Sequence, residues 1–247
     1  MPFTTAHIAA VLPVNKYFGR HFSTVGLMIG SISPDLEYII RMTLLGHYGH
    51  TILGIFIFDL PVGFALYVIY YGIIHKKLIA HLPQFLYSRF SETESFEWIR
   101  YMKKNFFTII LSLFVGTITH LVWDSFTHNE EYLLARYLTI LVKNVTLFGR
   151  VYPIYAVLQI ISTVVGMIFI FWFIHQLPQK AKIQRTDIRK IKRYWLSIII
   201  LAILIGIIRL AFGIPNEKLL GQLLVISMSV SLLSLIIVSW LSKSTLK

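Results

Sequence analysis

Long apolar runs dominate the hydrophobic pattern of the chain, and short connections between them carry most of the charge. A helix needs about 20 apolar residues to cross the hydrocarbon layer of a membrane. Five runs are long enough, at residues 51–74, 105–126, 153–175, 194–212 and 219–242. The pattern therefore predicts an all-α fold, a polytopic α-helical membrane protein with five clear transmembrane helices.

The first fifty residues follow a different pattern. Residues 22–33 are apolar but too few to cross a membrane as one helix, and Ser33-Pro34-Asp35 interrupts them. Two arrangements fit this segment: a re-entrant or interfacial helix pair on the outer side, or a sixth, broken span that leaves the N-terminus inside. Residues 89–104 carry charged side chains among apolar ones, which predicts an amphipathic interfacial helix before the second span; the charged residues are Glu92, Glu94, Glu97, Arg100, Lys103 and Lys104.

Composition excludes the soluble classes of protein. Apolar residues make up 56% of the 247 residues and charged residues 14%, against about 25% charged in ordinary soluble domains. So few charges cannot cover that much apolar surface in water. The net charge of +12 then indicates contact with anionic membrane lipids, and we expect no nucleic-acid partner. The absence of cysteine excludes thiolate metal ligands.

The basic residues predict an orientation, because Lys and Arg collect in cytoplasmic loops. Fifteen of them lie in the connections 75–104 and 176–193 and after the last span, against four in the other two connections, namely Arg136, Lys143, Arg150 and Lys218. We therefore expect a bacterial inner-membrane protein with a cytoplasmic C-terminus. We expect one integrated domain, in which residues 1–175 bear the functional site. Residues 176–247 would add a basic cytoplasmic loop and two C-terminal spans.

Histidines and carboxylates gather at the outer ends of the first two spans. His47 and His50 precede the first span, while His120, Asp124 and His128 lie near the end of the second at spacing i, i+4, i+8. That spacing places the three on one face of a helix. Ionisable residues within spans are costly and are candidates for function. The predicted orientation brings both groups to the extracytoplasmic surface.

Imidazole and carboxylate ligands suit Zn²⁺, and His120 with Asp124 supplies two of them from one helix. His50 and Asp35 are the candidates for the third and fourth ligands, and His7 is a further candidate if it reaches the outer face. The alternatives are that Asp35 caps a helix, and that His120 and Asp124 form a hydrogen-bonded pair between helices.

Five further ionisable residues have weaker cases. Glu37, His47 and His128 are candidates for extra ligands or for groups that hold the ligands. Asp59 lies mid-span, too deep for the same metal by our helix geometry; the alternative is an interhelical hydrogen bond with a backbone carbonyl that Pro61 leaves unpaired. Arg209 near the outer end of the fourth span is a candidate for binding an anionic headgroup, or for pairing with Asp59.

Five motifs in order carry a family resemblance: Met1-Pro2-Phe3-Thr4-Thr5-Ala6-His7, Gly30-Ser31-Ile32-Ser33-Pro34-Asp35, Gly49-His50-Thr51, Phe58-Asp59-Leu60-Pro61 and Thr119-His120-Leu121-Val122-Trp123-Asp124. Together they resemble the bacterial membrane family catalogued as domain of unknown function 4184, from residue 1 to about 175. A more distant likeness is to membrane-bound metal-dependent hydrolases of the YdjM type and to zinc-dependent phospholipase C. The likeness implies metal ligation by His7, Asp35, His50, His120 and Asp124, and one or two Zn²⁺ or other divalent ions.

These observations predict a metal-dependent, phospholipase-like hydrolase of a phosphoester, or a related bond, in a lipid or lipid-linked substrate. In that reading the catalytic residues are Asp35 or Asp124, bridging two ions, with Glu37 or His47 handling protons. One alternative is a transporter that uses Asp59 and Arg209. The other is a non-enzymatic membrane protein whose cluster is purely structural.

Overall fold

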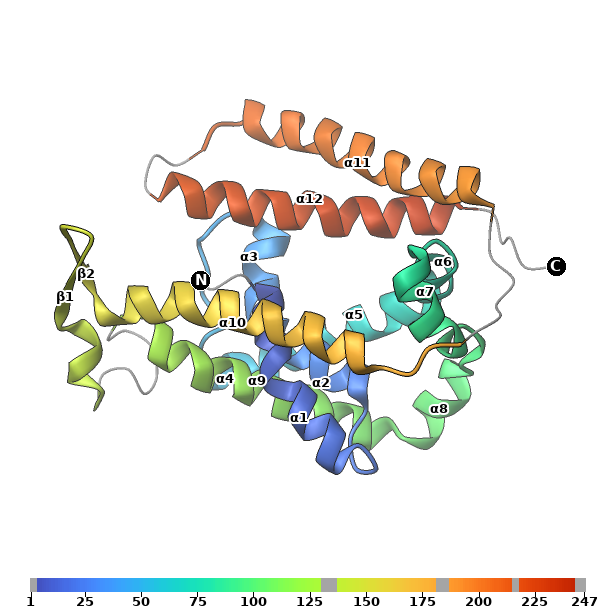
Figure 1. Cartoon of the computed structure of the whole chain (residues 1–247), viewed down its shortest axis with the longest axis horizontal. Coiled ribbons are helices and arrows are strands. Elements are labelled where there is room, and N and C mark those ends of the chain that lie inside the picture. Colours follow the sequence, from blue (N-terminus) through green and yellow to red (C-terminus); the bar gives the residue numbers. More distant parts are fainter. Residues whose placement is uncertain (1–3, 130–136, 181–186, 215–217, 243–247) are drawn as a thin grey trace. The chain divides into compact units, whose positions relative to one another are not determined.

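The computed structural model describes residues 4–129, 137–180, 187–214 and 218–242 (Figure 1). Five of its helices are long and apolar enough to span a membrane: Ile52–Ala80, Phe106–Thr127, Ile154–Gln176, Ile188–Ala211 and Leu219–Leu241. The chain is therefore a multi-pass, mostly α-helical membrane protein, as the hydrophobic pattern predicts. Five basic residues that entered the charge count lie outside the described residues: Arg136, Lys182, Arg185, Lys243 and Lys247.

The first span extends beyond its predicted C-terminal end. It continues to Ala80, six residues beyond the prediction, and two π-helical turns interrupt it. Its pieces are α4 (Ile52–Gly54), η3 (Ile55–Asp59), α5 (Leu60–Ile69), η4 (Tyr70–Ile74) and α6 (His75–Ala80). A π turn adds a residue to a helical turn and is frequent at functional sites. Asp59 lies in the first of these turns.

The N-terminal segment is a series of short helices. They are η1 (Thr4–His7), α1 (Ile8–Phe18), α2 (Thr24–Gly30), η2 (Ser33–Asp35) and α3 (Leu36–Arg41). None of them is long enough to cross a membrane alone. The expectation of one interfacial helix over 89–104 is wrong, because the chain forms three pieces: α7 (Gln84–Phe90), η5 (Ser91–Ser95) and α8 (Trp98–Lys104).

The remaining elements are α9 (Phe106–Thr127), η7 (Thr139–Val142), β1 (Asn144–Leu147), β2 (Arg150–Pro153), α10 (Ile154–Gln176), α11 (Ile188–Ala211) and α12 (Leu219–Leu241). The antiparallel hairpin of β1 and β2 was not predicted. Phe148 and Gly149 form its turn with φ of 51° and 75°, the backbone conformation that a tight hairpin turn requires. The fourth span begins at Ile188, six residues before the predicted start. The prediction from apolar residues missed its first turns because they are largely basic.

The chain folds as two compact units. The first contains Met1–Glu37, Gly46–Ala65 and Met102–His175. Within it, α2 packs along α9 at very short range. A Cβ on Gly30 would overlap the Leu113 carbonyl, and one on Gly116 would overlap the Leu27 carbonyl, so only glycine allows this approach. Because η2 follows α2 directly, the close packing holds Asp35 beside the C-terminal half of α9.

The second unit contains Tyr38–Leu45, Leu66–Tyr101 and Gln176–Lys247. Its antiparallel helices α11 and α12 pack side by side (Figure 1). The Tyr194 hydroxyl and Ser239 Oγ share a buried hydrogen bond of 2.8 Å between them. A small core of Ile79, Leu82 and Tyr87 packs against Trp195, which ties α6 and α7 to α11.

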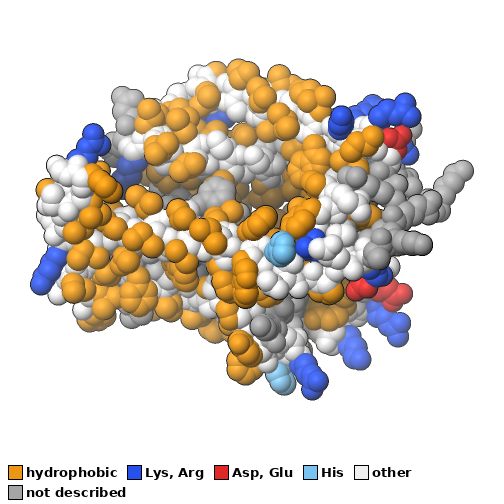
Figure 2. Space-filling view, in the orientation of Figure 1, with side chains coloured by type: hydrophobic (Ala, Val, Ile, Leu, Met, Phe, Trp, Pro, Cys, Tyr) orange, Lys and Arg blue, Asp and Glu red, His pale blue; other side chains and the backbone are white. Residues whose placement is uncertain are grey.

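Many apolar side chains of the spans point outward. On α10, Ile160, Val164, Ile168 and Phe171 are each more than half exposed. Figure 2 shows hydrophobic side chains covering the visible faces of the long helices, with Lys and Arg at their ends. Such a surface suits a lipid environment, where no water has to be excluded from it.

Candidate metal centre

Helix α9 supplies two of the site's side chains. His120 and Asp124 are fully buried and stand one turn apart on the same face of the helix. Nδ1 of His120 donates a hydrogen bond of 2.8 Å to the Ser31 carbonyl, so this nitrogen carries the proton. Nε2 then carries a lone pair that can coordinate a metal ion, and it lies 3.3 Å from Oδ2 of Asp124. A backbone carbonyl that orients a histidine in this way is typical of metal sites.

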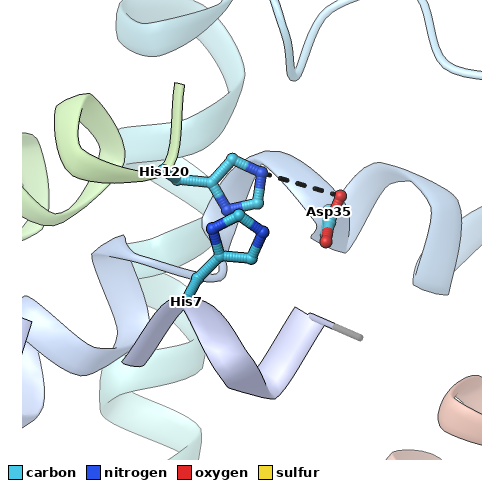
Figure 3. Close-up of side chains that lie close together, drawn as sticks. All are labelled: His7, Asp35 and His120. Atoms are coloured by element: carbon cyan, nitrogen blue, oxygen red, sulfur yellow. Dashed lines mark ion pairs between the residues drawn. The ribbon is translucent and has the colours of Figure 1, made fainter. Parts of the chain in front are cut away.

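Asp35 enters the site from η2. Thr4 donates a hydrogen bond of 2.6 Å to its Oδ2, which fixes the plane of the carboxylate. Its Oδ1 lies 3.5 Å from Nε2 of His50 and 3.8 Å from Nε2 of His120. Figure 3 shows the His120 ring directed at this carboxylate. Sequence analysis missed Thr4, because it lies 31 residues from Asp35 along the chain and no local spacing connects the two.

The loop before the first span presents His50. Glu37 is buried, and its two carboxylate oxygens accept hydrogen bonds of 2.8–2.9 Å from the backbone N–H groups of His47, Tyr48 and Gly49. A Cβ on Gly49 would overlap the Pro34 carbonyl, so the loop lies directly on η2. This anchoring places His50 Nε2 at 3.4 Å from Asp124 Oδ2.

Four donor atoms now form a compact set: Nε2 of His50 and His120, Oδ1 of Asp35 and Oδ2 of Asp124. The two nitrogens lie 3.4 Å apart, and each lies 3.3–3.8 Å from each of the two oxygens. Ligands at about 2.0–2.1 Å from a tetrahedral zinc lie roughly 3.3 Å apart. Ligands around an octahedral Mg²⁺ at a similar distance would lie roughly 2.9 Å apart. The spacing therefore fits a four-coordinate cation better than a six-coordinate one.

His7 lies against the other side of this set. Its ring stacks on that of His120 with the centroids 3.9 Å apart, as Figure 3 shows. Its Nε2 lies 3.3 Å from Oδ1 of Asp124, the oxygen that does not face His50. Asp124 thus faces His50 and His120 with one oxygen and His7 with the other, which is the arrangement of a carboxylate that bridges two cations.

Several buried polar atoms of the cluster make no well-formed hydrogen bond within the described chain. They are both ring nitrogens of His7, Oδ1 of Asp35 and both oxygens of Asp124. Buried polar groups without partners are rare, and a missing ion is one of the standard explanations. Two groups of three residues each bring their donor atoms within 4.8 Å of one another. They are His7–Asp35–His120 and His50–His120–Asp124. The residues therefore fit a bound divalent metal ion.

Electrostatics of the metal-free cluster lead to the same conclusion. Burial lowers the pKa of His50, but its hydrogen bonds to the carboxylates of Asp124 and Asp35 outweigh burial and raise the pKa to about 9. Burial and the charge of His120 lower the pKa of His7 to about 3. Although burial alone would raise the pKa of Asp35, the neighbouring charges of His120 and His50 lower it. The buried carboxylates therefore require positive charge beside them, which a proton on His50 or a cation can supply.

His128 supports the cluster from the end of α9. Its Nδ1 donates to the carbonyl of Asp124 at 3.1 Å, and its Nε2 lies 3.4 Å from the side-chain amide of Gln159 on α10. Burial lowers its pKa to about 4. His128 thus orients the backbone next to a ligand, and Gln159, which sequence analysis missed, holds it in place.

Four other candidates do not belong to this cluster. Glu37 uses its carboxylate to anchor the loop, and His47 is exposed and contributes its backbone N–H, so neither belongs to the groups of donor atoms above. Asp59 is fully buried in η3 without a hydrogen bond to a described residue. Arg209 donates to the carbonyls of Gly213 and Met42, at 2.8 and 3.2 Å.

Fold and site together define a class: a multi-pass helical membrane protein with a buried His–Asp cluster that could hold a metal ion. The chain belongs to the family described as domain of unknown function (DUF4184), whose model matches residues 1–240. The match extends well beyond residue 175, where the motif resemblance was expected to end, so the family model also covers the last two spans. Comparisons with curated proteins and with solved structures give no match.

Proposed function

We propose that this protein is a membrane-embedded, metal-dependent hydrolase that cleaves a phosphoester, or a related bond, in a lipid or lipid-linked substrate. The observation that carries the proposal is the set of four donor atoms at 3.3–3.8 Å from one another, two of which are buried carboxylate oxygens that make no hydrogen bond within the described chain. The motifs that resemble YdjM-type hydrolases and zinc-dependent phospholipase C supply the same residues.

The proposed metal is Zn²⁺, because nitrogen and carboxylate donors at tetrahedral spacing suit it. His50, His120, Asp35 and Asp124 would hold the first ion. His7 and the second oxygen of Asp124 offer a start for a second ion with open positions. When bound, such an ion polarises a phosphoryl oxygen and lowers the pKa of a coordinated water toward neutrality.

An apolar groove supports the lipid nature of the substrate. It has a volume of about 340 Å³ and runs between the first span and α9, the two elements next to the ligands. Its walls include Ile52, Ile55, Phe56, Phe114, Ile118 and Val122. Ile52 follows the ligand His50 by two residues, so an acyl chain in the groove would lie close to the metal centre. Apart from Ser125, the described residues that line the groove are apolar, which suits an acyl chain.

The roles of the remaining residues follow from their contacts. Thr4 and the Ser31 carbonyl orient Asp35 and His120, and Glu37 holds the loop that presents His50. Arg209 lies in the second unit, where it donates to the carbonyls of Gly213 and Met42, so the proposal gives it no role at the metal centre. By the distribution of Lys and Arg, we propose that the protein lies in the bacterial inner membrane with its C-terminus in the cytoplasm and the site facing the other side.

A purely structural metal is the second candidate, and one observation favours it. The four donors fill all four tetrahedral positions with protein atoms, and closed zinc sites of this kind are commonly structural. The position beside His7 distinguishes the candidates, because a structural ion has no use for a second, open position. His7→Ala should abolish hydrolysis and spare the first ion if the protein is an enzyme.

The test begins with metal analysis of the detergent-purified chain, followed by hydrolysis of a fluorescent phospholipid and of bis(p-nitrophenyl) phosphate. His120→Ala and Asp124→Asn should remove bound zinc and hydrolysis. His21→Ala, a histidine exposed outside the cluster, is the matched control and should change neither. Zinc in the wild type without hydrolysis of any phosphoester probe would support the structural candidate. The absence of any bound metal would overturn both.

A further inference from the structure

The second compact unit contains a pocket of about 640 Å³ at the end of the helix pair where α11 begins and α12 ends. Its described walls are Lys190, Arg193 and Tyr194 from α11, Val238 and Leu241 from α12, and His81. Figure 2 shows Lys and Arg side chains gathered at this end of α11. The pocket thus combines two cations with an apolar wall.

Helical spacing explains why these side chains meet. Lys190, Arg193, Tyr194 and Ser197 stand at i, i+3, i+4 and i+7, which places them on one face of α11. The wall behind the cations is rigid, since the buried Tyr194 ring stacks on His81 with the centroids 4.3 Å apart. The Trp195 ring N–H also donates to the His81 carbonyl at 2.8 Å.

The two cations lack counter-charges within the part of the chain that the structure describes. Neither Lys190 nor Arg193 forms an ion pair there, whereas Arg189 lies 3.4 Å from Asp187 and Lys180 lies 3.0 Å from Glu92. None of the described lining residues is acidic. A pocket that holds two uncompensated cations attracts an anion, and Arg with Lys is a common combination for phosphate.

We propose that this pocket binds the phosphate group of an anionic phospholipid. Lys190 and Arg193 lie in the first turns of a membrane span, which is the depth of lipid headgroups. Ser197 supplies a hydroxyl group for a phosphate oxygen. Val238 and Leu241 continue the wall into the span, where an acyl chain would pack. The proposal does not depend on the metal centre, which lies in the other unit.

The experiment uses the full chain in neutral detergent, titrated with phosphatidylglycerol or phosphatidylcholine, with retained lipids counted by native mass spectrometry. The wild type should retain phosphatidylglycerol selectively. Lys190→Gln with Arg193→Gln should weaken this binding roughly 10- to 30-fold, the scale expected for two basic residues at a membrane surface. Arg189→Gln with Lys192→Gln removes the same charge outside the pocket lining and should leave binding within about twofold.

A second variant, Ser197→Phe, fills the pocket without changing the charge and should also release the lipid. Melting curves of each variant establish that it is folded. Equal losses in both charge variants, or retention of phosphatidylcholine as well as phosphatidylglycerol, would overturn the proposal. Inorganic phosphate is the probe for a soluble ligand: if it binds with the same sensitivity to Lys190 and Arg193 while phosphatidylglycerol does not bind, the lipid assignment is wrong.

Discussion

The Nε2 atoms of His50 and His120 face each other at 3.4 Å inside the first unit. His120 donates its Nδ1 proton to the Ser31 carbonyl, so its neutral form presents only a lone pair to His50. Two facing lone pairs repel unless a proton or a cation lies between them. Asp35 and Asp124 border the same space, which favours a cation with more than one positive charge.

Thr4→Val is expected to weaken metal binding about 10- to 100-fold, the usual effect of losing a group that orients a ligand. Valine has the shape of threonine but cannot donate the 2.6 Å hydrogen bond to Asp35 Oδ2. Zinc affinity measured by chelator competition tests this expectation. Thr4→Ser keeps the hydroxyl and should restore most of the affinity. Equal affinity in the valine variant would show that Asp35 does not need this bond to reach the metal.

Glu37→Gln is expected to lower the melting temperature and the metal affinity together. Three backbone N–H groups point at the carboxylate, and the amide NH₂ of glutamine would face some of them instead of accepting from them. Glu97→Gln changes an exposed residue and is the control. A catalytic role for Glu37, as first expected from the sequence, predicts another result: lost hydrolysis with unchanged melting temperature and metal content.

Gly30→Ala and Gly116→Ala are each expected to destabilise the protein by about 1–3 kcal/mol or more, because the added Cβ overlaps backbone of the facing helix. Gly206→Ala on α11 is the matched control, since a Cβ there meets nothing within 4 Å. That change should stabilise the helix slightly, as alanine has the higher helix propensity. Thermal unfolding in detergent compares the three. Similar effects at all three glycines would contradict the close contact of α2 with α9.

The metal-free protein is expected to lose stability as pH rises from about 6.5 to about 9. The pKa of His50 is raised to about 9 in the folded chain. Its proton therefore contributes stability that is full below the unfolded value of about 6.5 and lost as pH passes the folded value. His7, with a lowered pKa of about 3, is neutral throughout this window.

Melting temperatures in the presence of a chelator measure this slope, and His50→Gln should flatten it. Zinc affinity should rise over the same interval, because the metal has to displace the His50 proton. A flat profile in the wild type would indicate that His50 holds no proton in the metal-free state.

Asp59→Asn is expected to leave zinc content and hydrolysis unchanged and not to lower the melting temperature. The Asp59 carboxylate is fully buried and has no hydrogen bond to a described residue. Asparagine therefore removes no hydrogen bond, and burying its neutral amide costs less free energy of desolvation than burying a charged carboxylate. The transporter alternative predicts that substrate flux into proteoliposomes depends on Asp59. Flux that Asp59→Asn abolishes would favour transport over hydrolysis.

The sequence by itself determined the class of protein and the number of spans. A membrane span can be recognised from the length of its apolar run alone. A helix in a membrane makes all its backbone hydrogen bonds within itself, so it needs no partner from elsewhere in the chain. The i, i+4 spacing likewise places His120 and Asp124 on one face without tertiary information. The residues proposed as ligands could therefore be named from the sequence, and their binding of a metal stays a prediction.

Only the tertiary structure decided how these residues meet and what holds them. The N-terminal helices and the π turns depend on packing, as do the glycine contacts between α2 and α9. Glu37 shows the difference: the sequence left open whether it is a ligand or a group that holds the ligands, and in the structure its carboxylate accepts hydrogen bonds from the backbone of residues 47–49. The sequence around Glu37 does not tell which distant backbone N–H groups will need a hydrogen-bond partner. Those groups need one only because folding buries them away from water.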